Sequence, residues 1–246
     1  MSKVDILGVN IDRITMTRAV ERVMQFLESD KLNSVYTPNP EFVMTARKDA
    51  EFKKILNEGA LVIPDGIGVV YASRIMGDPL PERVPGYDLV MNVFKNLKYE
   101  KVYFLGAKYG VIKEAVENMK STYKIDIVGY RDGYFGAEDE DYIIKEINAL
   151  DVDLLLVGLG SPRQEKFIYK NRNKLKVKVA IGVGGCFDVM AGITKRAPVI
   201  FQKLGLEWFY RLLRQPSRFI RMLKLPEFML IVIWKKIKNR ESKTEN

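Results

Sequence analysis

The sequence predicts an α/β protein in which a mainly parallel sheet lies between layers of helices, followed by a separate helical segment. Two observations predict the sheet: short apolar runs alternate with amphipathic stretches over residues 1–194, and several runs lead directly into a glycine-bearing turn. A third observation predicts the segment, because residues 195–246 become basic while staying apolar and aromatic. The expected fold is therefore a Rossmann-like layered α/β/α body with a C-terminal basic amphipathic helical appendage.

Composition narrows the class of protein. The 246 residues are 47% hydrophobic and 29% charged, which fits one large folded body and excludes a disordered chain. The single cysteine, Cys186, cannot form an intramolecular disulfide, and neither a signal peptide nor an apolar run of roughly 20 residues is present, so we expect a cytoplasmic protein. Histidine is absent, which excludes serine–histidine hydrolases, thiol–histidine proteases and histidine zinc sites.

The apolar runs predict seven strands, at Asp5–Val9, Ser34–Tyr36, Leu61–Ile63, Lys101–Leu105, Asp126–Gly129, Leu154–Val157 and Val179–Gly182. Helices are expected between them, at about residues 16–29, 40–57, 67–76, 110–122, 139–149 and 163–174. The pattern is clearest in the second half, where each buried run ends in a glycine turn.

Glycines follow the predicted strands where ligands of such sheets bind, outside the carboxyl ends. They predict a rim for a nucleotide at Gly106, Gly129, Gly158, Gly160 and Gly184. The alternative is that these glycines only permit the tight turns that any such fold needs. The run 158–160 lacks the third glycine of the dinucleotide fingerprint and no GxxxxGK[ST] run exists, so neither a dinucleotide oxidoreductase nor a P-loop enzyme is favoured.

Three rigid polar loops, at residues 37–40, 64–66 and 83–86, are candidate sites of chemistry. Asp65 precedes the predicted helix 67–76, so it either caps that helix or acts as a catalytic group. Gln164 and Glu165 lie in the first turn of the helix predicted from residue 163. They either cap that helix or accompany backbone N–H groups that meet a phosphate.

Two Asp-x-Asp strings, at 139–141 and 151–153, resemble the metal motifs of sugar-nucleotide enzymes. The first opens a predicted helix, where acidic residues favour the N-terminal dipole, and the second lies in a helix-to-strand turn. Carboxylates alone at this spacing are weak evidence for a cation. We therefore expect no metal site.

Nearly all the excess charge lies near the C-terminus. Residues 1–194 are formally neutral, whereas residues 195–240 carry twelve Lys and Arg against Glu207 and Glu227, a formal charge of +10. Both tryptophans, Trp208 and Trp234, fall in the same segment. Pro216 is expected to break it into short helices, as is Pro226.

Four arginines of this segment are spaced three, four and three residues apart, which places them along one helical stripe. They are Arg211, Arg214, Arg218 and Arg221. The pattern favours a helix lying at an anionic membrane surface. The alternatives are a helix packed on the body with a solvated basic face and, less favoured because no nucleic-acid module is present, a nucleic-acid interface.

Seven motifs in order resemble the WecG/TagA/CpsF family of bacterial glycosyltransferases (glycosyltransferase family 26), and most of all its TagA-type branch in wall teichoic acid synthesis. They are TPNPEF (37–42), PDGIGV (64–69), RVPG (83–86), FLGAK (104–108), GYF (133–135), GLGSPRQE (158–165) and GVGGCFDVMAG (182–192). The resemblance covers the whole body.

This resemblance implies an inverting transfer of N-acetylmannosamine from UDP-N-acetylmannosamine. The implied acceptor is the C4 hydroxyl of N-acetylglucosamine on undecaprenyl diphosphate, which gives a β-1,4 linkage. It also implies a peripheral enzyme at the inner face of the plasma membrane, with no metal cofactor and no nucleic-acid partner. A homo-oligomer stays open.

The resemblance assigns roles to individual residues. Asp65 would be the base, Thr37 and Asn39 would orient a sugar, Arg83 would neutralise diphosphate charge, and Gln164 would contact the donor. The lipid diphosphate would meet Arg214, Arg218 and Arg221. Two alternatives stay open: a family member with another UDP-sugar donor, and a non-catalytic nucleotide-sugar-binding or membrane-surface adaptor in which Asp65 is only a cap.

Overall fold

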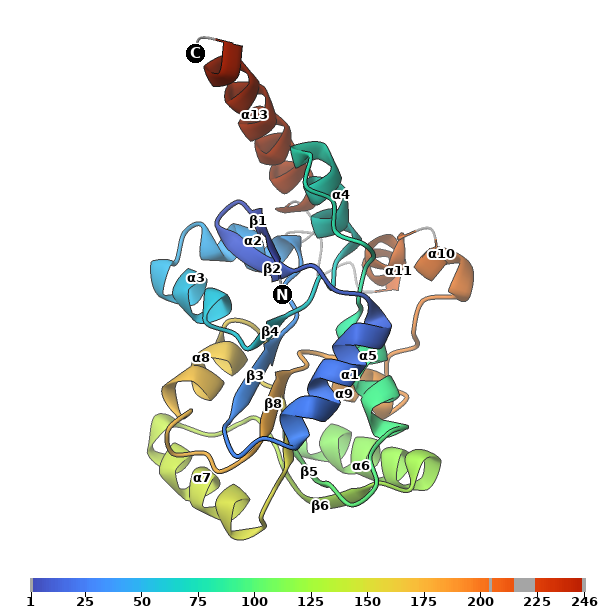
Figure 1. The fold of residues 1–246 in the computed structure, drawn as a ribbon. Helices are drawn as coiled ribbons and strands as arrows, with labels where there is room; N and C mark the ends of the chain where they lie inside the picture. The colour runs from blue at the N-terminus through green and yellow to red at the C-terminus, as the bar shows by residue number, and fades with distance from the viewer. Residues whose placement is uncertain (1, 204, 215–223, 245–246) are drawn as a thin grey trace.

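The structure is a computed structural model that describes residues 2–203, 205–214 and 224–244 (Figure 1). Its body is built on a six-stranded sheet in the order β4-β3-β8-β7-β5-β6, with all neighbouring strands parallel. The strands are β3 (Asn33–Tyr36), β4 (Leu61–Val62), β5 (Lys101–Gly106), β6 (Asp126–Arg131), β7 (Leu154–Gly158) and β8 (Val179–Gly182). Six of the seven predicted strands are thus confirmed.

Helices cover both faces of this sheet, so the predicted three-layer α/β/α body is confirmed. One face packs against α2 (Pro40–Ala46), α3 (Ala50–Asn57), α4 (Ile67–Met76), α7 (Glu140–Ala149) and α8 (Arg163–Lys170). The other packs against α1 (Met16–Leu27), α5 (Gly86–Phe94), α6 (Tyr109–Tyr123) and α9 (Cys186–Met190). Successive residues of one strand serve opposite layers: Leu155 and Val157 face the first, whereas Leu154 and Leu156 face the second.

The predicted first strand, Asp5–Val9, is wrong. The chain instead forms an antiparallel hairpin of β1 (Lys3–Ile6) and β2 (Val9–Asp12), outside the main sheet. Leu7 and Gly8 between them have φ of 54° and 95°, which reverses the chain within two residues. The hairpin is tied to β4 because the Val62 N–H donates to the Asp12 carboxylate at 2.7 Å.

Two helix predictions also needed correction, and one helix was missed. The single helix expected over 40–57 is two, since Asp49 caps a new helix through its Oδ1 and the Phe52 N–H at 2.9 Å. Helix α5 was not predicted, although its apolar spacing is helical. The helix expected over 163–174 ends at Lys170, and a short 3-10 turn, Ala137–Asp139, precedes α7.

The C-terminal segment contains α10 (Val199–Lys203), α11 (Glu207–Arg214) and α13 (Lys224–Thr244). Pro226 lies in the first turn of α13 and does not break it, so that prediction is wrong, whereas Pro216 lies outside the described residues. Helix α13 packs against α2 and α4 and places Phe228 and Val232 in the core, while its C-terminal part extends away from the body (Figure 1). The appendage is therefore anchored through apolar side chains.

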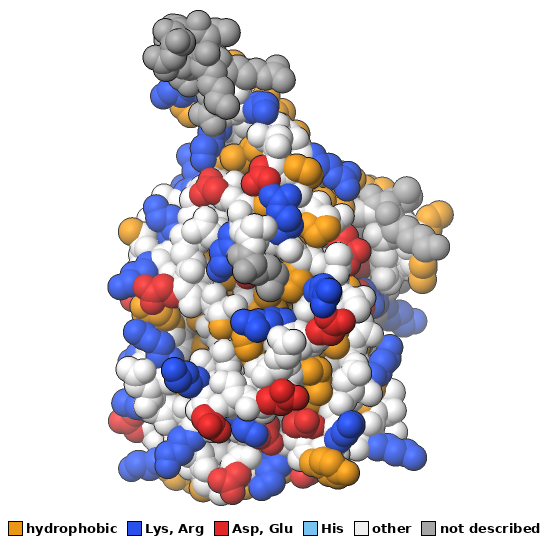
Figure 2. Space-filling model, in the orientation of Figure 1, with side chains coloured by type: hydrophobic (Ala, Val, Ile, Leu, Met, Phe, Trp, Pro, Cys, Tyr) orange, Lys and Arg blue, Asp and Glu red, His pale blue; other side chains and the backbone are white. Residues whose placement is uncertain are grey.

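The surface view agrees with the charge division seen in the sequence. On the face drawn in Figure 2, acidic and basic side chains are interspersed over the body. Among the described residues, no helix is long and apolar enough to cross a bilayer.

Candidate active site

The loops after β3 and β4 meet at the carboxyl edge of the sheet. The Thr37 hydroxyl donates to the carbonyl of Gly182 at the end of β8, at 3.4 Å. The Asp65 N–H donates to the carbonyl of Pro38 at 3.2 Å. Thr37 and Asp65, predicted from separate motifs, therefore lie in adjoining loops because parallel strands end at one edge.

Asp65 is not the N-cap residue of the helix that follows it, and its carboxylate accepts a hydrogen bond from the start of another helix. The N-cap of α4 is Gly66, with no side-chain cap, and the Asp65 Oδ1 instead accepts the N–H of Gly86 at 2.9 Å. Gly86 begins α5, and the preceding loop is held by a bond from the Val84 N–H to the Pro64 carbonyl at 2.8 Å. One carboxylate oxygen is thus oriented by a backbone donor from the RVPG loop.

Asn39 has a defined structural role. Its Oδ1 accepts the N–H groups of Glu41 at 2.9 Å and Phe42 at 3.2 Å, which caps α2. A Cβ at Gly66 would lie 2.9 Å from the Asn39 Cβ, so the loops of Asn39 and Asp65 touch. Contact of Asn39 with a sugar stays a prediction.

Arg83 is held by the C-terminal segment. Its Nη2 donates to the Glu207 carboxylate of α11 at 2.7 Å, and only 13% of the Arg83 side chain is exposed. Glu207 lies 3.9 Å from Arg196, which in turn pairs with Asp88 at 2.5 Å. The result is an ion chain of alternating sign, Arg83–Glu207–Arg196–Asp88.

Three members of this chain were missed by the sequence reasoning. The sequence did mark one of them, Glu207, as unusual, because it is one of only two acidic residues in the basic segment 195–240. Among the described residues, the Arg83 Nε has no hydrogen-bond partner although it is buried. A buried donor without an acceptor costs free energy, so an anionic ligand oxygen would be stabilised there.

Gln164 and Glu165 lie under the turn that follows β8. The Gly184 N–H donates to the Gln164 Oε1 at 3.0 Å, and the Gln164 Nε2 donates to the Glu165 Oε1 at 2.6 Å. Both side chains are buried, so neither is a simple exposed helix cap. Direct contact of Gln164 with the donor stays a prediction.

The predicted glycine rim divides into two groups. Gly106, Gly129 and Gly158 are required by packing, because a Cβ on them would collide with the Gly158 carbonyl, the Tyr103 ring and the Phe187 ring respectively. Gly160 and Gly184 have φ of 77° and 53°, and a Cβ on either would meet no atom within 4 Å among the described residues. These two therefore border open space at the edge of the sheet.

The sequence profile of the glycosyl transferase WecG/TagA/CpsF family matches residues 4–242, nearly the whole chain. The chain belongs to this family. It is 36% identical over 246 residues to a Staphylococcus aureus N-acetylglucosaminyldiphosphoundecaprenol N-acetyl-beta-D-mannosaminyltransferase, covering 98% of this chain and 96% of the relative. A Bacillus spizizenii relative of the same name is 39% identical over 211 residues, covering 85% of this chain and 81% of its own.

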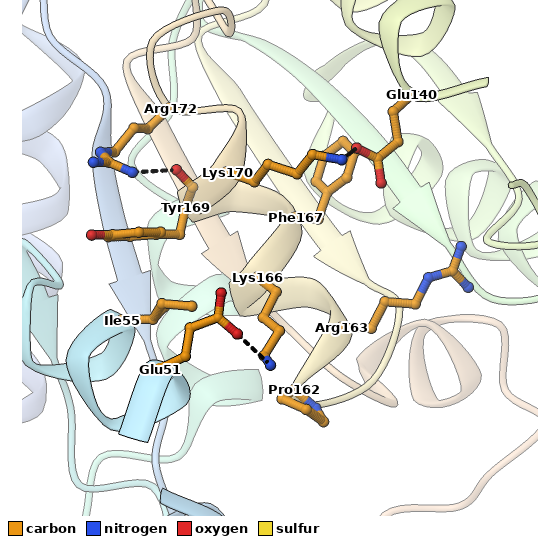
Figure 3. Close-up of a pocket in the computed structure, with 10 residues that line it drawn as sticks. All are labelled: Glu51, Ile55, Glu140, Pro162, Arg163, Lys166, Phe167, Tyr169, Lys170 and Arg172. Carbon is orange, nitrogen blue, oxygen red and sulfur yellow. Dashed lines mark hydrogen bonds and ion pairs between the residues drawn. The ribbon is translucent and has the colours of Figure 1, made fainter. Parts of the chain in front are cut away.

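A cavity of about 590 Å³ in this glycosyltransferase is lined by residues in and beside α8, together with residues of α3 and the first residue of α7 (Figure 3). None of its lining residues belongs to the loops 37–40, 64–66 or 83–86. Its cations are already paired or bonded. Lys166 contacts Asp49 and Glu51, Lys170 contacts Glu140, and the Arg163 guanidinium donates to two backbone carbonyls. We therefore place the candidate active site at the sheet edge and not in this cavity.

One aspartate of each Asp-x-Asp string forms an ion pair with a lysine. Asp141 pairs with Lys174 at 2.7 Å and Asp153 with Lys178 at 2.8 Å. Across the described residues, no group of three Cys, Asp or Glu side chains has the arrangement of a metal site.

The structure describes only some of the side chains that were predicted to contact the membrane or the lipid diphosphate. Trp208 on α11 and Trp234 on α13 are exposed, at 37% and 62%. Arg218 and Arg221 lie outside the described residues, as does the side chain of Arg214. Neighbouring apolar side chains on α10 and α11 are also exposed: Val199, Ile200, Phe209 and Leu213.

Proposed function

We propose that this glycosyltransferase transfers N-acetylmannosamine from UDP-N-acetylmannosamine to the C4 hydroxyl of N-acetylglucosaminyl-diphospho-undecaprenol, with inversion, in the synthesis of the wall teichoic acid linkage unit. The carrying observation is the near full-length similarity to relatives that bear this activity in their names. The placement of Asp65 where three loops meet supports it, because that is a fixed carboxylate at the ligand edge of the sheet.

In the proposed reaction, the acceptor C4 oxygen attacks the anomeric carbon from the face opposite UDP. The Asp65 carboxylate takes the hydroxyl proton, the new C–O bond forms, and the bond to UDP breaks with its electron pair leaving on the diphosphate. The Gly86 N–H orients Asp65 for this step. A carboxylate is the expected base in a chain without histidine.

The leaving diphosphate needs its developing charge stabilised. The turns at Gly160 and Gly184 allow close approach of the backbone to this diphosphate. Arg83 supplies a buried guanidinium, with one unpartnered N–H among the described residues, for the diphosphate of the acceptor lipid. These donors support a metal-independent reaction. We expect turnover to persist in excess EDTA; loss of turnover that Mg²⁺ or Mn²⁺ restores would contradict it.

The direct test is release of UDP with a short-chain diphospho-lipid bearing N-acetylglucosamine as acceptor. UDP-N-acetylmannosamine is compared with UDP-N-acetylglucosamine, UDP-glucose and UDP-N-acetylgalactosamine, and the product linkage is determined. Transfer from N-acetylmannosamine alone supports the proposal. Preference for another donor would assign a different family activity, and UDP binding without transfer from any donor would favour the adaptor function.

The acceptor lipid requires contact with a membrane surface. Exposed Trp234 lies in a stripe of α13 with Leu230, Ile233 and Ile237, opposite the buried Phe228. Trp234→Ala should therefore weaken binding to anionic vesicles several-fold without lowering thermal stability. Cosedimentation checks this, with Tyr99→Ala, a similarly exposed aromatic of the body, as the control; equal loss in both variants would contradict a specific α13 surface.

A further inference from the structure

The buried pair Gln164–Glu165 contains a carboxylate that the proposed reaction does not use. Both residues lie in the first turn of α8, and their exposed fractions are 1% and 0%. Burying a carboxylate costs folding free energy unless hydrogen bonds or ion pairs compensate for the lost hydration. The hydrogen-bond partner of Glu165 therefore indicates its role.

Glu165 fixes the orientation of the Gln164 carboxamide. Because the Gly184 N–H can only donate, the Gln164 oxygen must face it, and the bond measures 3.0 Å. The Gln164 nitrogen then points the other way, where it donates to the Glu165 Oε1 at 2.6 Å. Glu165 is thus the acceptor that completes the chain from Gly184 through Gln164.

This chain is packed directly against the end of β8. A Cβ on Gly182 would come within 2.7 Å of the Gln164 Nε2 and 3.0 Å of the Glu165 Oε1. The Gly182 carbonyl also accepts the Thr37 hydroxyl, at 3.4 Å. On the other side, Gly184 borders open space, so the pair supports a turn that a ligand can approach.

We propose that Glu165 is a positioning residue of the donor site: acting through Gln164, it holds the turn at residues 182–185 in the shape that receives the diphosphate of a UDP-sugar. This inference rests on the proposed function, because it takes the sheet edge as the nucleotide site. The proposal predicts that UDP binding needs a hydrogen-bond acceptor at position 165. A side chain that only fills the same space should not be sufficient.

The ionisation of Glu165 gives a further observable. Burial raises the pKa of its carboxyl to about 7, although the hydrogen bond from Gln164 lowers it. The titratable group that faces it from β3 is Tyr36, beyond which lie Arg172 and Tyr169. Since a carboxylate accepts a hydrogen bond more strongly than a neutral carboxyl, UDP affinity should rise as the pH passes upward through about 7.

Two substitutions separate the acceptor from the charge. Glu165→Gln keeps an oxygen for Gln164 and removes the titration, whereas Glu165→Met keeps the length and removes the acceptor. Calorimetric titration with UDP between pH 6 and pH 8 should show Glu165→Gln within about threefold of the wild type and with a weaker pH dependence. The dependence that remains comes from the terminal phosphate of UDP, whose second pKa is about 6. Glu165→Met should bind UDP about tenfold more weakly, because the hydrogen bond that orients the Gln164 side chain is lost.

Stability distinguishes positioning from a structural role. The pKa of Glu165 is raised in the folded chain, so its contribution to stability is present at low pH and lost as the pH rises from the unfolded value toward 7. Glu165→Gln should therefore melt above the wild type at pH 8, with a smaller difference at pH 5. Glu21→Gln, an exposed site on α1, is the matched control and should change neither the melting nor UDP binding.

A double-mutant cycle decides whether Glu165 acts through Gln164. Gln164→Ala should lower UDP affinity, and adding Glu165→Met should lower it no further. Wild-type UDP affinity in Glu165→Met, fully additive losses, or an unchanged pH profile in Glu165→Gln would each overturn the inference. Because the readout is UDP binding, these results differ from failure of the proposed function, in which the wild type binds UDP and transfers no sugar.

Discussion

The two halves of the sheet edge present different chemistry. At the ends of β3 and β4, side chains from separate loops converge, and Asp65 is oriented by a backbone donor. At the ends of β5 and β7, the turns are made of glycine, with Gly106 and Gly158 packed against each other. The first half therefore presents a carboxylate held in one orientation, whereas the second presents backbone that a ligand can approach closely.

The two halves of the edge fit the two requirements of a transfer reaction, a proton acceptor and a binding site for a diphosphate. A proton acceptor must be a side chain held in one direction, whereas a diphosphate is well met by backbone N–H groups that a Cβ would obstruct. Strand β8 lies between the halves, and its terminal Gly182 contacts Thr37 on one side and Gln164 on the other. Substitutions in each half should therefore affect different steps.

The largest effect is expected in the side-chain half. Asp65→Asn retains the oxygen that accepts the Gly86 N–H, so the fold should persist, but the amide cannot take the hydroxyl proton. We expect turnover to fall at least about 10²-fold with UDP affinity within about twofold of the wild type. Initial rates and calorimetric UDP binding measure the two quantities.

Asp78→Asn is the matched control for this change, because Asp78 is an exposed carboxylate outside the site. It should retain wild-type turnover. If folded Asp65→Asn also turned over at the wild-type rate, Asp65 would be an organiser of the RVPG loop and another group would have to be the base.

A tenfold effect is expected in the glycine half. Gly160 has φ of 77° and open space around it, so Gly160→Ala adds backbone strain of about 1 kcal/mol and a methyl group where the nucleotide approaches. UDP affinity should fall about tenfold. Gly8→Ala adds similar strain at φ of 95° in the remote hairpin and should lower the melting temperature without changing UDP affinity.

Equal UDP affinity in the Gly160 and Gly8 variants would mean that Gly160 is only a turn residue and that the glycine half does not bind the nucleotide. A loss of affinity confined to Gly160→Ala would support nucleotide binding by that half. The same variant should leave the acceptor KM unchanged, which separates it from substitutions in the side-chain half.

Patterns local in sequence predicted much of the fold. Six predicted runs of three to five residues matched β3 to β8 within two residues at each end, because a strand buried on both faces must be continuously apolar. The failed prediction, Asp5–Val9, crossed a turn that two positive φ angles create. Alternation at Val4, Ile6, Val9 and Ile11 serves a hairpin as well as a strand, so periodicity alone did not separate them.

The candidate site was predicted less completely, since its contacts join distant segments. Motifs placed Thr37 and Asp65 at strand ends, and parallel strands bring such ends together. The pairing of Arg83 with Glu207 spans 124 residues and depends on how α11 docks, which no local pattern encodes. The same holds for Phe228, whose burial beside α2 and α4 makes the appendage part of the core.

The smallest effect concerns Arg83, whose place in the side-chain half depends on its partner. Glu207→Gln keeps a hydrogen-bond acceptor and removes the negative charge that competes with a substrate diphosphate for Arg83. We expect the acceptor KM to fall about threefold, with kcat little changed and a stability loss of up to about 3 kcal/mol, because the pair is largely buried. The gain should shrink as salt screens the charges. A rise in the acceptor KM would instead mean that Arg83 needs the Glu207 charge to stay in place, and α11 would then be a working part of the site on which substrate affinity depends.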